Sequence, residues 1–295
     1  MAGTQPQPPG PGASSEQVEE RSRWWWWLVV VAVVVVVVLL VVQPWAEHQT
    51  EPPPGTSPSS ASDVPSAPST APSPTSTTPA TPAPVPGADA VFDTTTLATL
   101  FVTDADLVAD VPAAAGTPLQ PGIGAGDLAW GLPSGSTIEP ASCTTAVTVV
   151  DSEPDAFDAR SSSNEALDWE QRVTVLDDGT DAREAFADLV TTVDACPEYS
   201  QVNPGVDGSS WVAQPAIEGQ GAYPSIVQEI THRSEGSSLP EYRGHMLVGN
   251  AIVTWTATSL AVDTAPDAAL ATLGDPASLN AMVQARAQQA VGGLG

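Results

Sequence analysis

The sequence predicts an α+β fold, an antiparallel sheet flanked by helices, preceded by one transmembrane helix and a disordered Pro/Ser/Thr-rich linker. Three observations support this prediction. An uncharged apolar run lies near the amino end, a proline-rich stretch follows it, and the remaining residues mix capped helical patterns with alternating strand patterns. We therefore divide the chain into four segments, 1–23, 24–43, 44–88 and 89–295.

The amino-terminal segments predict a short tail and a membrane span. Residues 1–23 are polar, contain several prolines and are expected to form a disordered cytoplasmic tail. From Trp24 to Val42 the chain is uncharged, and a helix of that length reaches roughly 28 Å, close to the thickness of a hydrocarbon core. Residues 24–43 are therefore predicted to form a transmembrane helix.

A cleaved signal peptide is the alternative to this span. The apolar run is longer than a typical signal-peptide core, and Gln43-Pro44-Trp45 offers no small-residue cleavage site. These features favour an uncleaved signal-anchor. Arg21 and Arg23 lie on its amino side. Because positive charge stays in the cytoplasm, we expect a single-pass cell-membrane protein with an extracytoplasmic C-terminal domain.

Residues 44–88 have the composition of a spacer. Of the 37 residues from Pro52 to Ala88, 26 are Pro, Ser or Thr. Such a stretch has no core-forming residues and favours polyproline II, so it could extend on the order of 110 Å at about 3.1 Å per residue. A passive linker is the simplest interpretation, and O-glycosylation of its hydroxyl groups stays open.

Four helices are predicted within residues 89–295. Thr103 to Asp106 is a capping pattern followed by apolar residues. A second capping box at Asp181 precedes Phe186, Leu189, Val190 and Val193, which have the spacing of an amphipathic helix. Residues 266–273 predict a short helix, and Asp275 followed by proline predicts the start of the last one.

Strand patterns lie between these helices. Residues 144–150 are β-branched, residues 169–175 alternate apolar and polar side chains, and residues 226–231 form a third candidate. Residues 246–248 and 251–258 flank Gly249-Asn250, which is typical of a two-residue hairpin turn. The connections expected to be long acidic loops are 112–142, 151–166 and 198–224.

The two cysteines predict a disulfide. Cys143 is expected at the start of a strand and Cys196 at the end of the 181–195 helix, and both would face an oxidising compartment. Closing a loop of this length stabilises the folded state by about 4 kcal/mol in the chain-entropy model. A catalytic thiol is the alternative, but no histidine lies at a recognisable spacing.

Composition limits the partners. The net charge is −27, with eight arginines and no lysine, so nucleic-acid binding is excluded. The strongly negative field favours cationic partners and divalent cations. Expected partners are therefore the membrane, through one span, a small-molecule or cell-wall ligand, and divalent cations; no cofactor is expected.

Few residues point to chemistry. Asp151, Glu153, Asp155 and Asp158 offer oxygen ligands for a cation, but they lack the glycine-containing pattern of calcium loops, which favours an ordinary acidic loop. His232 and His245 show no zinc-binding spacing. No GxSxG motif is present, and no pair of carboxylates stands out for glycoside hydrolysis. No metal site or catalytic residue is therefore assigned.

A ligand cleft, if present, has aromatic and cationic candidates. Core packing explains most aromatic residues of the domain, whereas Trp211 and Tyr223 lie in polar stretches that suggest a more open position. Arg172 and Arg243 are scarce cations on predicted strands, suited either to clamp an anion or to pair with neighbouring carboxylates. The candidate cleft residues are Trp169, Arg172, Trp211, Tyr223, Tyr242 and Arg243.

Residues 93–291 resemble the PknH-like extracellular sensor domain of mycobacterial transmembrane Ser/Thr kinases and related actinobacterial lipoproteins. The order of several loose motifs carries the resemblance: Leu97–Thr103 before a capped helix, Cys143, a helix ending at Cys196, His245–Val253 and Asn280–Val283. The resemblance implies a helix-flanked antiparallel sheet with a ligand cleft and no enzymatic activity. The absence of lysine also fits an actinobacterial source.

These features favour a membrane-anchored extracytoplasmic sensor-like domain that binds a ligand. A structural or adhesive cell-envelope protein without a pocket is the second hypothesis, and an extracytoplasmic hydrolase is the third. A concave pocket would favour the first, a filled convex domain the second, and carboxylates clustered in a groove the third.

Overall fold

The structure is a computed structural model that describes residues 87–234, 236–261 and 264–295. The predicted tail, the predicted span and almost all of the predicted linker lie outside these residues. Within the described part, each helix is too short or too polar to cross a bilayer.

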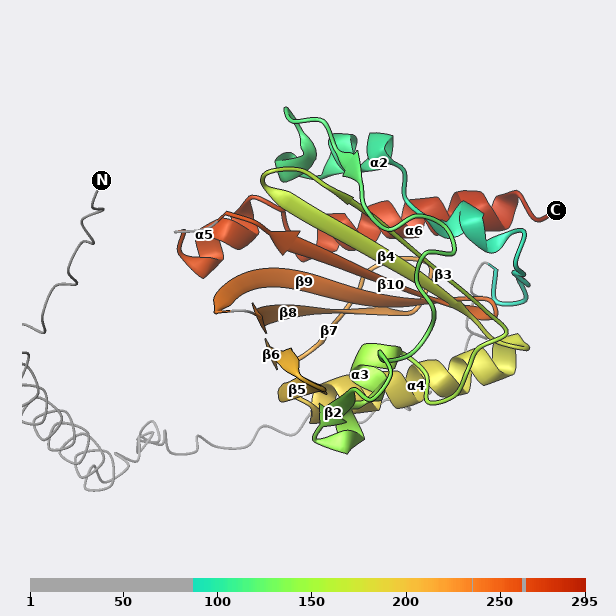
Figure 1. Ribbon diagram of the computed structural model, residues 1–295. Coiled ribbons are helices and arrows are strands. Elements are labelled where there is room, and N and C mark those ends of the chain that lie inside the picture. Colours follow the sequence, from blue (N-terminus) through green and yellow to red (C-terminus); the bar gives the residue numbers. More distant parts are fainter. Residues whose placement is uncertain (1–86, 235, 262–263) are drawn as a thin grey trace, which may run out of the picture. The chain divides into compact units, whose positions relative to one another are not determined.

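One sheet of ten strands organises the domain, and the pairings between described strands are all antiparallel (Figure 1). The strand order is β1-β3-β4-β10-β9-β8-β6-β5-β2, and β7 also pairs with β8. The strands are β1 (Gln120–Pro121), β2 (Thr137–Glu139), β3 (Ala156–Ser163), β4 (Leu167–Val175), β5 (Glu198–Asn203), β6 (Val206–Ala213), β7 (Ile217–Glu218), β8 (Ser225–Ser234), β9 (Ser237–Val248) and β10 (Ala251–Ser259).

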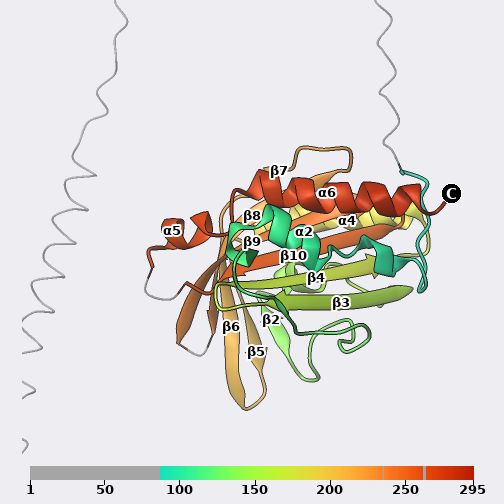
Figure 2. The same cartoon turned by 90° about the horizontal axis from the view of Figure 1, so that it is seen from above.

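Helices cover both faces of this sheet, and Figure 2 shows α6 and α2 lying across one of them. One hydrophobic cluster joins that face to α2, α5 and α6, and a second cluster joins the other face to α3 and α4. The result is an α+β domain with a three-layered centre. The helices are α2 (Asp104–Asp110), α3 (Thr145–Thr148), α4 (Gly179–Ala195), α5 (Pro266–Ala271) and α6 (Pro276–Gly292), with 3-10 turns η1 (Leu97–Leu100), η2 (Pro112–Ala114) and η3 (Ala141–Cys143).

The predicted helices are confirmed, and their caps explain where they begin. Thr103 and Asp106 form a reciprocal capping box at α2. Asp275 accepts a hydrogen bond from the Ser278 amide at the start of α6. The cap predicted at Asp181 is wrong, because α4 begins two residues earlier and Asp178 accepts the first free amides.

The strand predicted over residues 144–150 is also wrong. Residues 141–148 instead form η3 and the single turn α3, although the segment is β-branched. Its buried side chains pack against α4 rather than pairing with a strand, so tertiary packing overrides local propensity. The segments predicted as long loops contain strands that polar composition concealed, β1 and β2, β3, and β5, β6 and β7.

The predicted disulfide is confirmed. Cys143, at the end of η3, bonds to Cys196, the residue that follows α4, with their Cα atoms 5.8 Å apart. Both cysteines are buried in the cluster between the sheet, α3 and α4. The bond therefore joins the segment before α3 to the end of α4.

The hairpin predicted at Gly249-Asn250 is confirmed and joins β9 to β10. On the face covered by α6, Trp169 of β4 and Trp255 of β10 stack with ring centroids 5.5 Å apart. Gly244 of β9 is the cross-strand partner of Trp255. The indole occupies the space that a side chain at Gly244 would fill, so this core depends on a glycine there.

We predict that Gly244→Ala lowers the free energy of unfolding by about 1–3 kcal/mol, because its Cβ would overlap the fully buried Trp255 ring and force the core to shift. Urea denaturation of the full chain, monitored by circular dichroism, measures this change. Gly292→Ala is the matched control, since a Cβ there meets no other atom and should change stability by less than about 1 kcal/mol. Equal effects of both substitutions would contradict the prediction.

Candidate functional site

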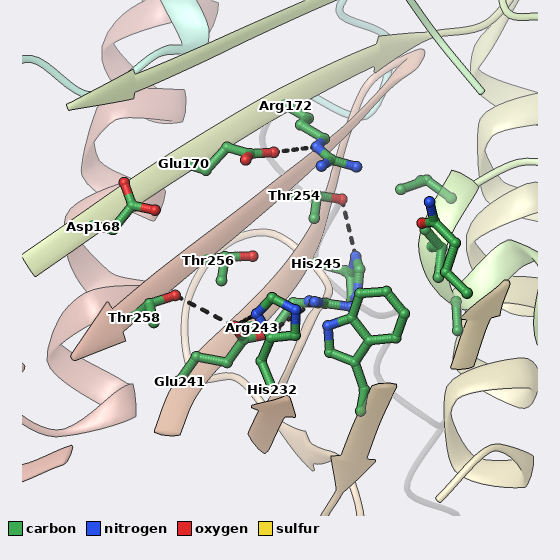
Figure 3. A pocket seen from close by; sticks show the side chains of 15 residues that line it. Asp168, Glu170, Arg172, His232, Glu241, Arg243, His245, Thr254, Thr256 and Thr258 are labelled. Carbon is green, nitrogen blue, oxygen red and sulfur yellow. Dashed lines mark hydrogen bonds and ion pairs between the residues drawn. The ribbon is translucent and has the colours of Figure 1, made fainter. Parts of the chain in front are cut away.

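A cleft of about 200 Å³ opens on the face of the sheet opposite the two stacked tryptophans. Strands β4, β10 and β9 supply most of its side chains, and the α3 segment supplies apolar ones (Figure 3). Its lining residues are Ala146, Val147, Val149, Asp168, Glu170, Arg172, Gln201, Trp211, His232, Glu241, Arg243, His245, Thr254, Thr256 and Thr258.

Alternation along the three central strands creates this polar surface. Every second residue of each strand faces the cleft, and the antiparallel register sets these residues side by side. Three rows therefore cross the sheet, each centred on a threonine of β10. The rows are Asp168–Thr258–Glu241, Glu170–Thr256–Arg243 and Arg172–Thr254–His245.

A buried ion pair lies at the centre of the cleft. Arg243 Nη2 donates to Glu241 Oε1 at 2.9 Å, while the side chains are only 13% and 2% exposed. Arg243 Nη1 donates to the Tyr199 hydroxyl at 2.9 Å, and Thr258 donates to the second Glu241 oxygen. Burial alone would lower the pKa of Arg243, but Tyr199 and Glu241 raise it overall, so the guanidinium stays charged.

An aromatic stack packs beside this ion pair. Trp211 of β6 lies between Tyr199 and His232, with ring centroids 5.1 Å and 5.2 Å away respectively. The Arg243 guanidinium lies 5.8 Å from the Trp211 ring. Because neighbouring rings cover both faces of the indole, Trp211 offers no flat platform on which a sugar ring could stack.

Two histidines in the cleft are held neutral by their surroundings. His245 is 1% exposed, and burial together with Arg243 and Arg172 lowers its pKa to about 3. Its Nδ1 lies 2.9 Å from Thr254 Oγ1, whereas its buried Nε2 has no partner among the described residues. Burial also lowers the pKa of His232, against the opposing influence of Glu241.

The remaining charges lie along β4. Arg172 Nε donates to Glu170 Oε1 in a close ion pair that is about one third exposed. In the described part of the chain, no residue accepts a hydrogen bond from the two terminal nitrogens of Arg172. Asp168, an exposed residue near the start of β4, has no ion-pair partner there either. Partial burial of its carboxyl group and repulsion from Glu170 and Glu241 raise its pKa.

The wall opposite the strands contains a strained residue. Val149, which follows α3, adopts φ 71° and ψ −41°, a conformation that β-branched residues rarely take. Its amide donates to the Thr145 carbonyl, and the Thr148 hydroxyl donates to the Val150 carbonyl across it. The Val149 side chain lines the cleft. Such strain is typical of functional sites.

The structure brings three of the six predicted cleft residues together and places the other three elsewhere. Arg172, Trp211 and Arg243 line the cleft. Trp169, Tyr223 and Tyr242 belong to the hydrophobic layer under α5 and α6, on the other face of the sheet. Trp169 and Tyr242 each lie between two cleft residues on their own strands. Because side chains alternate between the two faces of a strand, both point to the opposite face of the sheet.

No metal centre emerges from the residues that the structure describes, where no three His, Cys, Asp or Glu side chains gather in a ligating arrangement. Of the acidic loop considered for a cation, Asp158 accepts a hydrogen bond from the Gly126 amide and pairs with Arg160. His232 and His245 both line the cleft, but their nearest polar contacts are Glu241 and Thr254.

The cleft also contains residues that the sequence analysis did not select. Asp168, Glu170, Glu241 and the threonines of β10 belong to polar triplets with a period of two. The triplets are Asp-x-Glu-x-Arg from 168, Glu-x-Arg-x-His from 241 and Thr-x-Thr-x-Thr from 254. Three such triplets on strands expected to pair are a detectable signal for a polar surface on one face of a sheet.

Comparison with known proteins gives similarity in structure only. No protein-family model matches the chain, and no curated protein matches its sequence. The crystal structure of the extracellular domain of PknH from Mycobacterium tuberculosis is similar with a TM-score of 0.47 and 15% identity, over 65% of this chain and 99% of that one. An uncharacterised protein from Mycobacterium smegmatis gives 0.35 and 13%, over 64% and 96%.

The first of these structures is a domain of the kind that the sequence resembles.

We predict that His245 makes the domain acid-sensitive. Its folded-state pKa of about 3 lies below the ordinary value of 6.5, so between these values the unfolded chain takes up a proton that the folded chain does not. The free energy of unfolding should therefore fall by about 2–3 kcal/mol more in the wild type than in His245→Gln between pH 7 and pH 4.5.

Urea denaturation of the full chain at both pH values tests this difference. His232→Gln serves as the control, because His232 is 28% exposed and should account for a smaller share. The prediction fails when wild type and His245→Gln lose stability in parallel.

Proposed function

We propose that this protein is a membrane-anchored, extracytoplasmic, sensor-like protein that binds a small ligand in the charged cleft. The observation that carries the proposal is the cleft itself, in which Arg172, Asp168 and the Nε2 of His245 present polar groups without partners among the described residues. Asp168 is exposed and Arg172 is about one third exposed, so a ligand can reach both, whereas the Nε2 of His245 is buried, where a polar group without a partner is costly.

The cleft favours ligand binding over a purely structural or adhesive role. A structural or adhesive domain needs no cleft, because a filled convex domain would serve that role equally well. Its size, about 200 Å³, is below the roughly 300–1,000 Å³ typical of drug-sized ligands and suits a small molecule.

Binding is also the better proposal than hydrolysis. Three carboxylates line the cleft, and the raised pKa of Asp168 is a property that a general acid needs. The other two, however, are engaged: Glu241 pairs with Arg243 and is 2% exposed, and Glu170 pairs with Arg172. Neither carboxylate is free to act as a nucleophile or to activate water, so we propose no enzymatic activity.

The proposed location is supported by the sequence and by the disulfide. The apolar run 24–43 with arginines on its amino side favours export of the rest of the chain. The bond between Cys143 and Cys196 is of the kind that forms and persists in oxidising compartments.

We predict that at least one class of small polar molecule raises the thermal midpoint of the full chain in detergent micelles. The probes are monosaccharides, amino acids, short peptides and dicarboxylates. At a concentration 100-fold above its dissociation constant a ligand adds about 2.7 kcal/mol, and therefore shifts the midpoint by roughly 5–10 °C for a domain of this size.

A variant with a filled cleft makes this test specific. Thr256→Phe places a ring on the central row of the cleft and should abolish the shift. Thr191→Phe, on the exposed side of α4, is the matched control and should retain it. Absence of any shift with all four classes, or a shift that Thr256→Phe preserves, would overturn the proposed binding role.

We predict that protease added to intact spheroplasts removes an epitope at the carboxyl end and spares one at the amino end. The reason is that Arg21 and Arg23 should hold the tail in the cytoplasm. Detection of both epitopes by immunoblotting, before and after permeabilisation, measures the topology. A carboxyl-terminal epitope that is cut only after permeabilisation would refute the proposed location.

A further inference from the structure

A second cavity adjoins the charged cleft and differs from it in character. It also measures about 200 Å³ and is walled mainly by the loop over residues 128–133, the α3 segment and Phe157 of β3. Trp130 is fixed there by a hydrogen bond from its Nε1 to the Thr148 carbonyl, 3.1 Å long. Leu128, Trp130, Leu132, Val147 and Phe157 make its surface largely apolar.

Arg172 stands at the junction of the two cavities. It lines both of them, as do Gln201, Val147 and Val149. Its Nε is bound to Glu170, while its terminal nitrogens have no acceptor among the described residues. A positive group with free donors, a carboxylate beside it and an apolar chamber therefore meet at one point.

The charges of the cleft restrict which ligand this junction suits. Its three carboxylates and two arginines carry a formal charge of −1, and the predicted extracytoplasmic domain around it carries −23. A simple anion would reach Arg172 only against this negative field. A simple cation would leave the Arg172 donors unpaired. A neutral molecule with an anionic and a cationic group side by side satisfies both.

We propose that the ligand is a small zwitterion with an apolar side chain, as in an apolar α-amino acid. Its carboxylate accepts hydrogen bonds from the terminal nitrogens of Arg172, and its ammonium group pairs with Asp168 and with Oε2 of Glu170, the oxygen that Arg172 Nε does not contact. Its side chain enters the apolar cavity beyond Arg172. This assignment rests on the proposed binding function of the cleft and specifies the class of ligand.

Isothermal titration calorimetry of the full chain in detergent micelles tests the assignment with leucine and three analogues that each lack one feature. Leucinamide lacks the carboxylate, 4-methylpentanoate lacks the ammonium group, and glycine lacks the side chain. We expect leucine to bind about 10- to 100-fold more tightly than each analogue, the loss typical of one charge-assisted hydrogen bond or one buried side chain.

Variants separate a lost contact from a damaged fold. Arg172→Gln should weaken leucine binding about 10- to 100-fold and should not weaken the binding of leucinamide to a similar extent, because leucinamide is a cation without a carboxylate. Arg233→Gln, an exposed arginine outside both cavities, is the matched control. Leu128→Asn, at a residue already 36% exposed, should reduce the advantage of leucine over glycine.

The outcomes distinguish this assignment from the proposed function. Binding of leucinamide or 4-methylpentanoate as tightly as leucine would overturn the zwitterion, and equal binding of glycine would overturn the role of the apolar cavity. Failure of leucine, while another class of probe shifts the thermal midpoint in a manner that Thr256→Phe abolishes, would overturn the zwitterion and leave the binding function in place.

Discussion

The register of β4, β10 and β9 is the constraint on which both the core and the cleft depend. Side chains alternate between the faces of a strand, so a slip of one residue would exchange the tryptophans of the core for the charges of the cleft. The turn at Gly249-Asn250 fixes this register. Asn250 also bonds to the Phe92 backbone and the Leu176 carbonyl, and Gly249, at φ 59°, approaches the Ala90 carbonyl too closely for any side chain.

Charges are tolerated on the cleft face because each buried one has a partner. Glu241 accepts hydrogen bonds from Arg243 and Thr258, so its burial does not leave an isolated charge. His245 avoids the problem by staying neutral, as the fall of its pKa to about 3 indicates. Those partners are internal, whereas Asp168 and the terminal nitrogens of Arg172 have none among the described residues. Asp168 and Arg172 are both accessible at the edge of the cleft, where a ligand can reach them, whereas the unpaired Nε2 of His245 is buried.

Local signals in the sequence predicted four of the five described α-helices, four of the ten strands and little of the site. Caps such as Thr103 and Asp275 act within one helical turn, and the β9–β10 hairpin depends on adjacent residues, so both could be predicted. Strands such as β3 and β5 are polar because one side of each is partly exposed, which removes the apolar alternation that marks a strand. The cleft joins residues up to 112 positions apart, between Ala146 and Thr258, and their meeting depends on strand order, which no local pattern specifies.

The disulfide holds in place the α3 segment, which forms the wall of the cleft opposite its charged strands. A single turn such as α3 is not stable by itself, because helix nucleation is unfavourable, and Val149 beside it adds strain of the order of 1–3 kcal/mol. Cys143 lies two residues before α3 and is bonded to Cys196 at the end of α4, so the segment is held where it packs. Because Val147 and Val149 line both cavities, this covalent bond stabilises the site as well as the fold. Disulfides persist in oxidising compartments, so the cleft keeps its shape there.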